Sequence, residues 1–224
     1  MKAKSVLMHA ALLTGVLLLN DPLSATVESP IVGYTTVTTS PGFNMLGVVF
    51  NGLGGQTLTL NDIVSGDFQD NDKILIRKDG RYYTYTYYDG YGWWDESTGA
   101  EATEPCSVGT AFWLETPGRS VEVTLKGAVP TGEYQYTSTA GFQMISMATP
   151  RELDLNTDVT WSGLTDGDEI QIRKDGRYYT YTYYDGYGWW DESTGAISTT
   201  KVQAGSSLWL RTHVAGSTLI ISGI

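Results

Sequence analysis

The sequence is poor in the residues on which disulfide-bonded domains and many enzymes depend. Its 224 residues include one cysteine and two histidines. Because Cys106 has no partner in the chain, no internal disulfide can form and the fold must rest on its hydrophobic core. We expect Cys106 to be a small buried residue, since Val202 stands 96 positions later; a free thiol for intermolecular pairing or nucleophilic attack is the alternative.

The usual sequence signatures of catalysis are also missing. His9 lies in the N-terminal apolar segment and His213 stands alone. The sequence contains no HExxH, GxSxG or phosphate-binding glycine pattern and no Cys/His metal spacing. We therefore expect no catalytic residue, no metal and no cofactor.

Basic residues are scarce as well. Fourteen lysines and arginines are outnumbered by 25 aspartates and glutamates, which gives a formal net charge of −11. An acidic chain is repelled by nucleic acid and by anionic membrane surfaces, so we expect neither as a partner. The candidate partners are a polysaccharide, another surface protein or a second copy of the chain.

Only one long apolar run is present, from Val6 to Leu19. Lys2 and Lys4 precede it and small residues ending at Ala25 follow it, which is the pattern of a secretory signal peptide over residues 1–25. The run is shorter than the roughly 20 residues needed to cross a bilayer. We expect export to the periplasm, the cell surface or the extracellular space, with no membrane span after the signal is removed.

A block of 25 residues is present twice without a substitution. Ile76–Ala100 and Ile172–Ala196 both read IRKDGRYYTYTYYDGYGWWDESTGA, 96 positions apart. Selection on the protein or a recent local copying of the DNA would each explain the identity. The repeat predicts two tandem modules, residues 29–128 and 129–224, which are joined too closely for a flexible linker.

Within each module, short runs with period-two alternation are separated by Gly, Asp, Asn and Pro. One helical turn is expected at Asn61–Val64 and no longer helix. The pattern predicts an all-β fold of two antiparallel β-sandwich or barrel-like modules. The strands expected in the first module are Ile31–Thr38, Phe43–Phe50, Lys73–Lys78, Arg81–Tyr88, Ala111–Thr116 and Ser120–Lys126, with equivalents in the second.

Inside the block, Asp79-Gly80 predicts a two-residue hairpin with a type I′ turn. The resulting register pairs Arg77 with Tyr82, on which the guanidinium group can stack. Leu75 becomes Gln171 in the second copy, so its face of the strand is expected to be the wetter one. The face expected to be core carries Tyr83, Tyr85 and Tyr87, and the exposed face carries Tyr82 and Tyr88.

A second turn leads to Trp93 and Trp94, whose side chains point to opposite faces if the strand continues. Exposed Tyr and Trp beside carboxylates are typical of carbohydrate-binding surfaces, because sugar rings offer C–H faces to aromatic rings and hydroxyls to carboxylates. Aromatic residues that only fill the core and cover strand edges are the alternative. The candidate ligand-contact residues are Tyr82, Tyr88, Tyr91, Trp93, Trp94 and Asp95, with Tyr178, Tyr184, Tyr187, Trp189, Trp190 and Asp191 in the second copy.

Two further uses of the acidic residues are considered. Asp89 or Asp95 together with Glu96 would suit a glycoside hydrolase, but this needs a deep cleft that loops so short seldom build. The acidic loop before the hairpin lacks the glycine and terminal glutamate of an EF-hand, so we expect solvated turn residues and no calcium site. These loop residues are Asp67, Asp70 and Asp72, echoed by Asp166, Asp168 and Glu169.

The order of motifs GFxM, DxIxIR, GWWD, GxxxWL and VxVTLxG resembles a β-module found in tandem in secreted proteins of some Gram-negative bacteria. That module has no assigned activity, so the resemblance implies export and a β fold and assigns no site residue. We expect a non-enzymatic protein with a structural, adhesive or surface-assembly role; carbohydrate or peptidoglycan binding is the alternative, and a glycoside hydrolase the second alternative. The motifs occupy Gly42–Met45, Asp72–Arg77, Gly92–Asp95, Gly109–Leu114 and Val121–Gly127.

Overall fold

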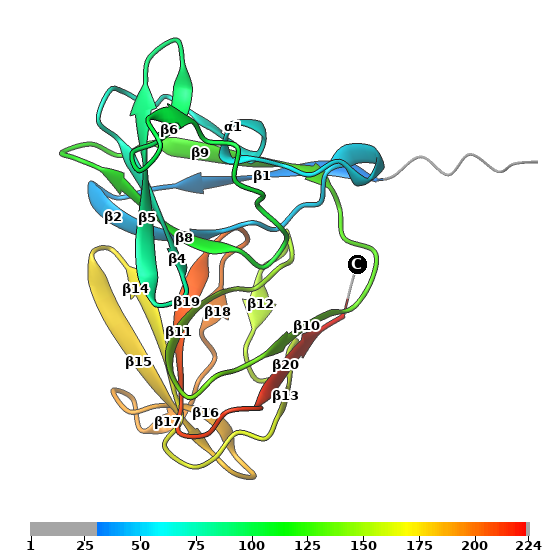
Figure 1. Ribbon diagram of the computed structural model, residues 1–224. Coiled ribbons are helices and arrows are strands. Elements are labelled where there is room, and N and C mark those ends of the chain that lie inside the picture. The colour runs from blue at the N-terminus through cyan, green and yellow to red at the C-terminus, as the bar shows by residue number, and fades with distance from the viewer. Residues whose placement is uncertain (1–30, 223–224) are drawn as a thin grey trace, which may run out of the picture.

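The computed structural model describes residues 31–222, so the predicted signal segment 1–25 lies outside the described residues. The chain is built almost entirely of antiparallel strands, which confirms the predicted all-β class (Figure 1). Two hydrophobic cores form, one from residues before Tyr134 and one from Tyr134 onwards. We call the corresponding halves the first and the second module.

The first module has nine strands. Its elements are β1 (Val32–Thr38), β2 (Gly42–Gly47), the 3-10 turn η1 (Leu53–Gly55), the helix α1 (Leu60–Ile63), β3 (Val64–Gly66), β4 (Lys73–Lys78), β5 (Arg81–Tyr88), β6 (Gly92–Asp95), β7 (Ala100–Glu101), β8 (Ala111–Thr116) and β9 (Glu122–Ala128).

The second module repeats this plan without the helix. Its elements are β10 (Tyr134–Thr137), β11 (Gly141–Ser146), β12 (Leu153–Asp154), β13 (Thr160–Ser162), β14 (Glu169–Lys174), β15 (Arg177–Tyr184), β16 (Gly188–Asp191), β17 (Ala196–Ile197), β18 (Lys201–Val202), β19 (Ser207–Thr212) and β20 (Thr218–Ile221).

Each module packs a large sheet on a small one. The six-stranded sheet of the first module has the order β2-β8-β4-β5-β6-β7, and its three-stranded sheet the order β1-β9-β3. The second module has β11-β19-β14-β15-β16-β17 and β10-β20-β13, with β12 paired to β18. Apolar side chains on the facing sides of the two sheets, such as Phe112, Leu114 and Leu125, are buried between them. This is a sandwich arrangement with alternate residues of each strand directed inward.

The predicted hairpin is confirmed in both copies. Asp79 and Gly80 have φ values of 49° and 76°, the positive values that a type I′ turn requires. Arg77 pairs with Tyr82 as expected. The stacking expected of Arg77 on Tyr82 is not found, because Arg77 donates a hydrogen bond to the carbonyl of Phe142. It occurs at the equivalent pair of the second copy, where the Arg173 guanidinium lies 6.0 Å from the Tyr178 ring.

One expectation about the tyrosine face is wrong. Tyr85 is buried and Tyr87 is half-buried, but Tyr83 is 37% exposed, and its equivalent Tyr179 is exposed as well. All three tyrosines of the first copy lie on the predicted face. However, Tyr83 is the nearest of the three to the hairpin turn, where the first three residues of β5 are all exposed whichever face they lie on.

The expectation of a small buried residue at Cys106 is confirmed. The thiol is free and buried in the first core, and Val202 is buried at the equivalent position. Burial raises the pKa of the Cys106 thiol to about 12, since the thiolate would be poorly solvated there. A thiol with so high a pKa is a poor nucleophile near neutral pH.

The acidic loop meets the expectation of solvated turn residues only in part, since Asp67, Asp70 and Asp166 are exposed. Asp72 and Asp168 are both buried, and each organises the loop before its hairpin. The Asp72 carboxylate accepts the Gln69 N–H and pairs with Arg119, while that of Asp168 accepts hydrogen bonds from the backbone N–H and from Nδ1 of His213. These pairings and hydrogen bonds offset the free-energy cost of burying a carboxylate.

The two modules meet through β2 and β8 of the first and β11 and β19 of the second (Figure 1). The Gly47 N–H donates to the carbonyl of Gly205 at 2.9 Å. β2 ends at this contact, three residues earlier than predicted. The wetter face predicted from Gln171 is therefore covered near β8, where Trp113 is buried.

Equivalent residues of the repeat face one another at this interface. The rings of Trp113 and Trp209 lie 6.5 Å apart, and each also makes an edge contact with the phenylalanine of its own GFxM motif. A Cβ placed on Gly47 would lie 2.2 Å from Oγ of its equivalent, Ser146. Such self-complementary contacts are those of a two-fold interface, so the modules are arranged like the halves of a fused dimer.

No helix among residues 31–222 is long and apolar enough to cross a membrane.

Candidate ligand-binding site

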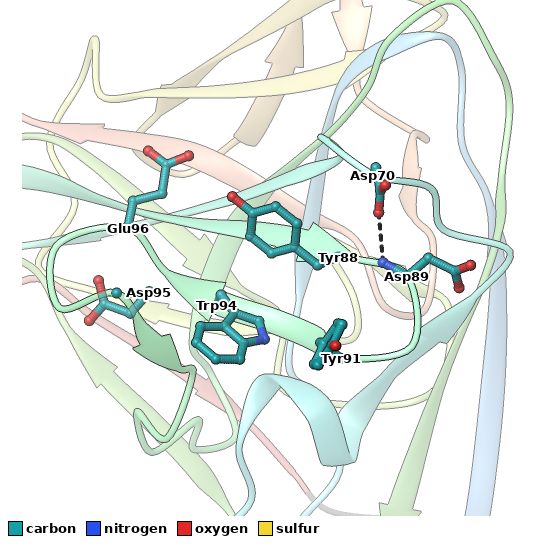
Figure 2. Close-up of a pocket in the computed structure, with 8 residues that line it drawn as sticks. Asp70, Tyr88, Asp89, Tyr91, Trp94, Asp95 and Glu96 are labelled. Atoms are coloured by element: carbon teal, nitrogen blue, oxygen red, sulfur yellow. Dashed lines mark hydrogen bonds between the residues drawn. The ribbon is translucent and has the colours of Figure 1, made fainter.

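The end of β5 and the strand β6 position an aromatic cluster on the outer face of the large sheet. The turn after Tyr88 uses Gly90, whose φ is 76°, and brings Tyr91 back toward β6. Thr86 pairs with Trp94 in the β5–β6 ladder, so both residues point away from the core. Tyr88, Tyr91 and Trp94 consequently gather on one side of the turn (Figure 2).

The tryptophan pair is divided as the alternation of strand side chains requires. Trp93 is only 1% exposed and packs edge-on against Phe68 and Tyr87, with ring centroids 5.0 and 5.3 Å away. Trp189 is equally buried in the second module. Trp93 and Trp189 therefore belong to the cores, and the expectation that they contact a ligand is wrong because neither side chain is accessible.

An open pocket of about 740 Å³ lies over the outer residues (Figure 2). Tyr91, which is 72% exposed, meets Trp94 edge-on, with ring centroids 6.3 Å apart and an angle of 80° between the rings. The indole N–H of Trp94 is buried and has no hydrogen-bond partner among the described residues. The pocket is lined by Asp70, Tyr88, Asp89, Tyr91, Trp94, Asp95, Glu96 and Gly99.

Two of the carboxylates in the pocket wall hold its loops in place. Oδ1 of Asp70 accepts the backbone N–H of Asp89 at 2.7 Å (Figure 2). Oδ1 of Asp95 accepts both the N–H and the hydroxyl of Ser97, and these hydrogen bonds lower the pKa of Asp95. Both carboxylates thus fix the tight turns on either side of the aromatic cluster.

Glu96 and Asp89 complete the negative rim. Glu96 accepts a hydrogen bond from the Thr86 hydroxyl and lies 3.7 Å from Nζ of Lys73. The Asp89 side chain forms no hydrogen bond or ion pair within residues 31–222 and points outward from the turn (Figure 2). Lys73 is partly exposed, so its screened charge offsets little of the negative rim.

The second copy of the block forms an equivalent cluster in the second module. Tyr184 and Tyr187 each meet Trp190 edge-on, at 6.4 and 6.5 Å between ring centroids and with interplanar angles of 90° and 86°. Asp166 accepts the N–H of Asp185 at 2.6 Å, and Asp191 accepts the N–H and the hydroxyl of Ser193. The second module therefore repeats the edge contact of Tyr91 with Trp94 and the two hydrogen-bonded turns of the first.

One charge beside the pocket is reversed between the modules. Lys73 pairs across the strands with Glu115, whereas the equivalent pair in the second module is Glu169 with Arg211, 3.2 Å apart. The neighbour of Glu96 is therefore Lys73, whereas the equivalent neighbour of Glu192 is Glu169. Glu192 accepts the Tyr184 hydroxyl at 2.9 Å instead, and this bond raises the pKa of Tyr184.

The structure brings together four of the six candidates predicted in each copy: Tyr88, Tyr91, Trp94 and Asp95 in the first. Tyr82 and Tyr178 are exposed but lie near the hairpin turn, about 20 Å along the strand from Tyr88 and Tyr184. The sequence did not identify Asp70, Asp89 and Glu96 as ligand-contact residues, although all three line the pocket. The last two were considered only as catalytic groups, and the Asp70–Asp89 contact has no signal in the sequence.

The two clusters lie at opposite ends of the molecule. Arg77, near the turn of the first hairpin, contacts Phe142 of the second module, and Arg173 lies 5.9 Å from the Trp113 ring of the first. Since each hairpin turn points toward the other module, the far ends of β5 and β15 point away from it. Figure 1 accordingly shows β6 at the upper end and β16 and β17 at the lower end.

Comparison with protein-family models, with curated proteins and with solved structures finds no match for this chain.

Proposed function

We propose that this protein is an exported, non-enzymatic saccharide-binding protein that cross-links polymer chains through its two ends. The observation that carries the proposal is an aromatic cluster flanked by carboxylates, which lines a pocket in the first module and recurs at the opposite pole in the second. Pockets with aromatic walls and a few polar groups are the usual form of small-ligand sites.

The polar groups of the pocket support binding more than hydrolysis. A glycoside hydrolase needs one carboxylic acid whose pKa is raised so that it can protonate the leaving group. The pKa of Asp95 is lowered, and Glu96 is engaged by Thr86 and Lys73. The pocket is also open to solvent on one side, whereas a hydrolase encloses its substrate in a cleft.

The placement of the sites supports cross-linking of separate chains. Two sites on one face would raise the avidity for a single polymer, provided that both could be engaged at once. Sites at opposite poles engage two polymers or two surfaces more readily. The cross-linking role also unites the adhesive function expected from the sequence with its carbohydrate-binding alternative.

The test of cross-linking uses beads coated with peptidoglycan fragments or with chitin. The wild-type chain should bind the beads and cluster them. Tyr91→Ala alone or Tyr187→Ala alone should keep bead binding through the intact end but abolish clustering, because each variant is monovalent. The double variant should lose both, and circular dichroism should show an unchanged fold, since both side chains are mostly exposed.

Clustering by either single variant at the wild-type level would contradict the two-ended mechanism. Binding that survives in the double variant would contradict the assignment of the pockets. Tyr82→Ala with Tyr178→Ala is the matched control, because it removes two exposed tyrosines of the same strands at the hairpin ends and should change neither property.

A further inference from the structure

In each cluster the tyrosine rings stand nearly perpendicular to the tryptophan ring that they contact. Tyr184 and Tyr187 stand at 90° and 86° to Trp190, and Tyr91 stands at 80° to Trp94. A sugar ring that stacks on a flat platform is best served by rings whose faces are parallel to it. Perpendicular rings surround a compact group instead, which is the arrangement used to hold alkylammonium cations.

The charges around the rings also favour a cation. Asp70, Asp89, Asp95 and Glu96 line the first pocket, and Lys73 is the nearest basic residue in an ion pair with any of them. Within residues 31–222, the arginines stacked on aromatic rings lie over Trp113, Tyr178 and Phe142, all outside the pockets. The pocket rings are therefore not occupied by a cation of the protein itself.

We propose that each pocket recognises a positively charged alkylammonium group carried by the saccharide ligand, such as the protonated amine of an amino sugar that lacks its N-acetyl group. The inference rests on the proposed function and names the ligand class of the same sites. Each ring face attracts such a cation through its quadrupole, more strongly where water is excluded. The rim carboxylates add attraction that added salt screens.

The reversed charge pair makes the two ends unequal. Lys73 stands beside Glu96 at the first end, and Glu169 occupies its place at the second. Lys73 therefore weakens the attraction of the first pocket for a cation, and the second cluster has no lysine at that position. We expect the second end to bind the cationic ligand more tightly, and Lys73→Gln should bring the first end closer to the second.

The test compares glucosamine hexamer with N-acetylglucosamine hexamer by isothermal titration calorimetry at about pH 6, where the amine is protonated. The two oligomers share one backbone and differ in charge. The cationic oligomer should bind at least about tenfold more tightly at low salt, a preference of about 1.4 kcal/mol. The difference should shrink as salt is added, and tetramethylammonium chloride should compete with the oligomer more strongly than sodium chloride at equal concentration.

Variants separate the pocket from the general acidity of the chain. Glu96→Gln with Glu192→Gln should weaken binding of the cationic oligomer several-fold. Glu122→Gln with Glu133→Gln, which removes the same charge from exposed positions outside the pockets, should leave binding within about twofold. Equal losses in both variants would overturn the cation site in favour of non-specific attraction.

The remaining outcomes distinguish the inference from the proposed function. Equal affinity for both oligomers, lost in Tyr91→Ala with Tyr187→Ala, would overturn the cation preference and leave saccharide binding intact. Absence of binding by either oligomer at millimolar concentration, or binding that this double variant retains, would overturn both.

Discussion

Replacing Trp93 by alanine should destabilise the protein by about 3–5 kcal/mol, because a large buried indole is lost and leaves a cavity among Phe68, Tyr87 and the two sheets. This is a large part of the roughly 5–15 kcal/mol that stabilises a typical domain. Urea unfolding followed by circular dichroism measures the change. Trp189→Ala should have an effect of similar size on the second module.

The neighbouring residue is the matched control. Trp94→Ala removes an identical side chain one position later in the block, yet from the outer face of the sheet, and should cost about 1 kcal/mol or less. In contrast, Trp94→Ala with Trp190→Ala should abolish ligand binding. A larger loss of stability from Trp94→Ala than from Trp93→Ala would contradict the division of the pair between core and pocket.

The second large effect is expected at the contact between the modules. Gly47→Ser places a side chain within 2.2 Å of Ser146 Oγ and 2.4 Å of its Cβ, so we expect a loss of about 1–3 kcal/mol from overpacking. Because Gly47 and Ser146 are equivalent positions that face each other, Ser146→Gly should relieve the clash. The exchange variant with both substitutions should recover most of the wild-type stability.

Urea unfolding of the wild type, the two single variants and the exchange variant gives the coupling between the positions. We expect a coupling of about 1 kcal/mol or more, as found for residues in direct contact. Additive effects would show that the two positions do not meet. Small-angle scattering on the Gly47→Ser variant measures its maximum dimension. A larger value than in the wild type would show that the loss of stability arises at the interface between the modules.

The parts of the fold that depend on local rules were predictable. The Asp79-Gly80 turn fixed the hairpin register, and alternation correctly placed Trp93 and Trp94 on opposite faces. Three strands, β4, β5 and β8, have the predicted bounds. These features follow from the φ values of a turn and from the period of a strand, which the sequence displays directly.

The parts that depend on tertiary packing were not predictable. Alternation assigns Tyr83 to the core face, but only tertiary packing decides whether the end of the strand next to the turn is covered. The burial of Trp113 depends on the second module, and the pairing of Asp72 with Arg119 joins residues 47 positions apart. A single sequence contains no local pattern for contacts of this kind.

The same limit explains the candidate site. The repeated block contains the same aromatic residues twice, and the alternation of strand side chains excludes about half of them from the ligand-binding surface. The carboxylate rim is assembled by two turns and by the Asp70–Asp89 hydrogen bond, whose geometry is visible only in the structure. The position of the two pockets at opposite poles depends on the two-fold arrangement of the modules, which a tandem repeat alone does not specify.

The most direct test of the central claim is a titration of ¹⁵N-labelled protein with glucosamine hexamer, followed through the indole N–H signals of its seven tryptophans. The pockets predict that the Trp94 and Trp190 signals move together with the ligand, while the buried Trp93 and Trp189 signals stay within the small shifts of an unaltered core. Shifts confined to Trp113 and Trp209 at the module interface, or no shift of any indole at saturating ligand, would contradict binding at the Trp94 and Trp190 clusters.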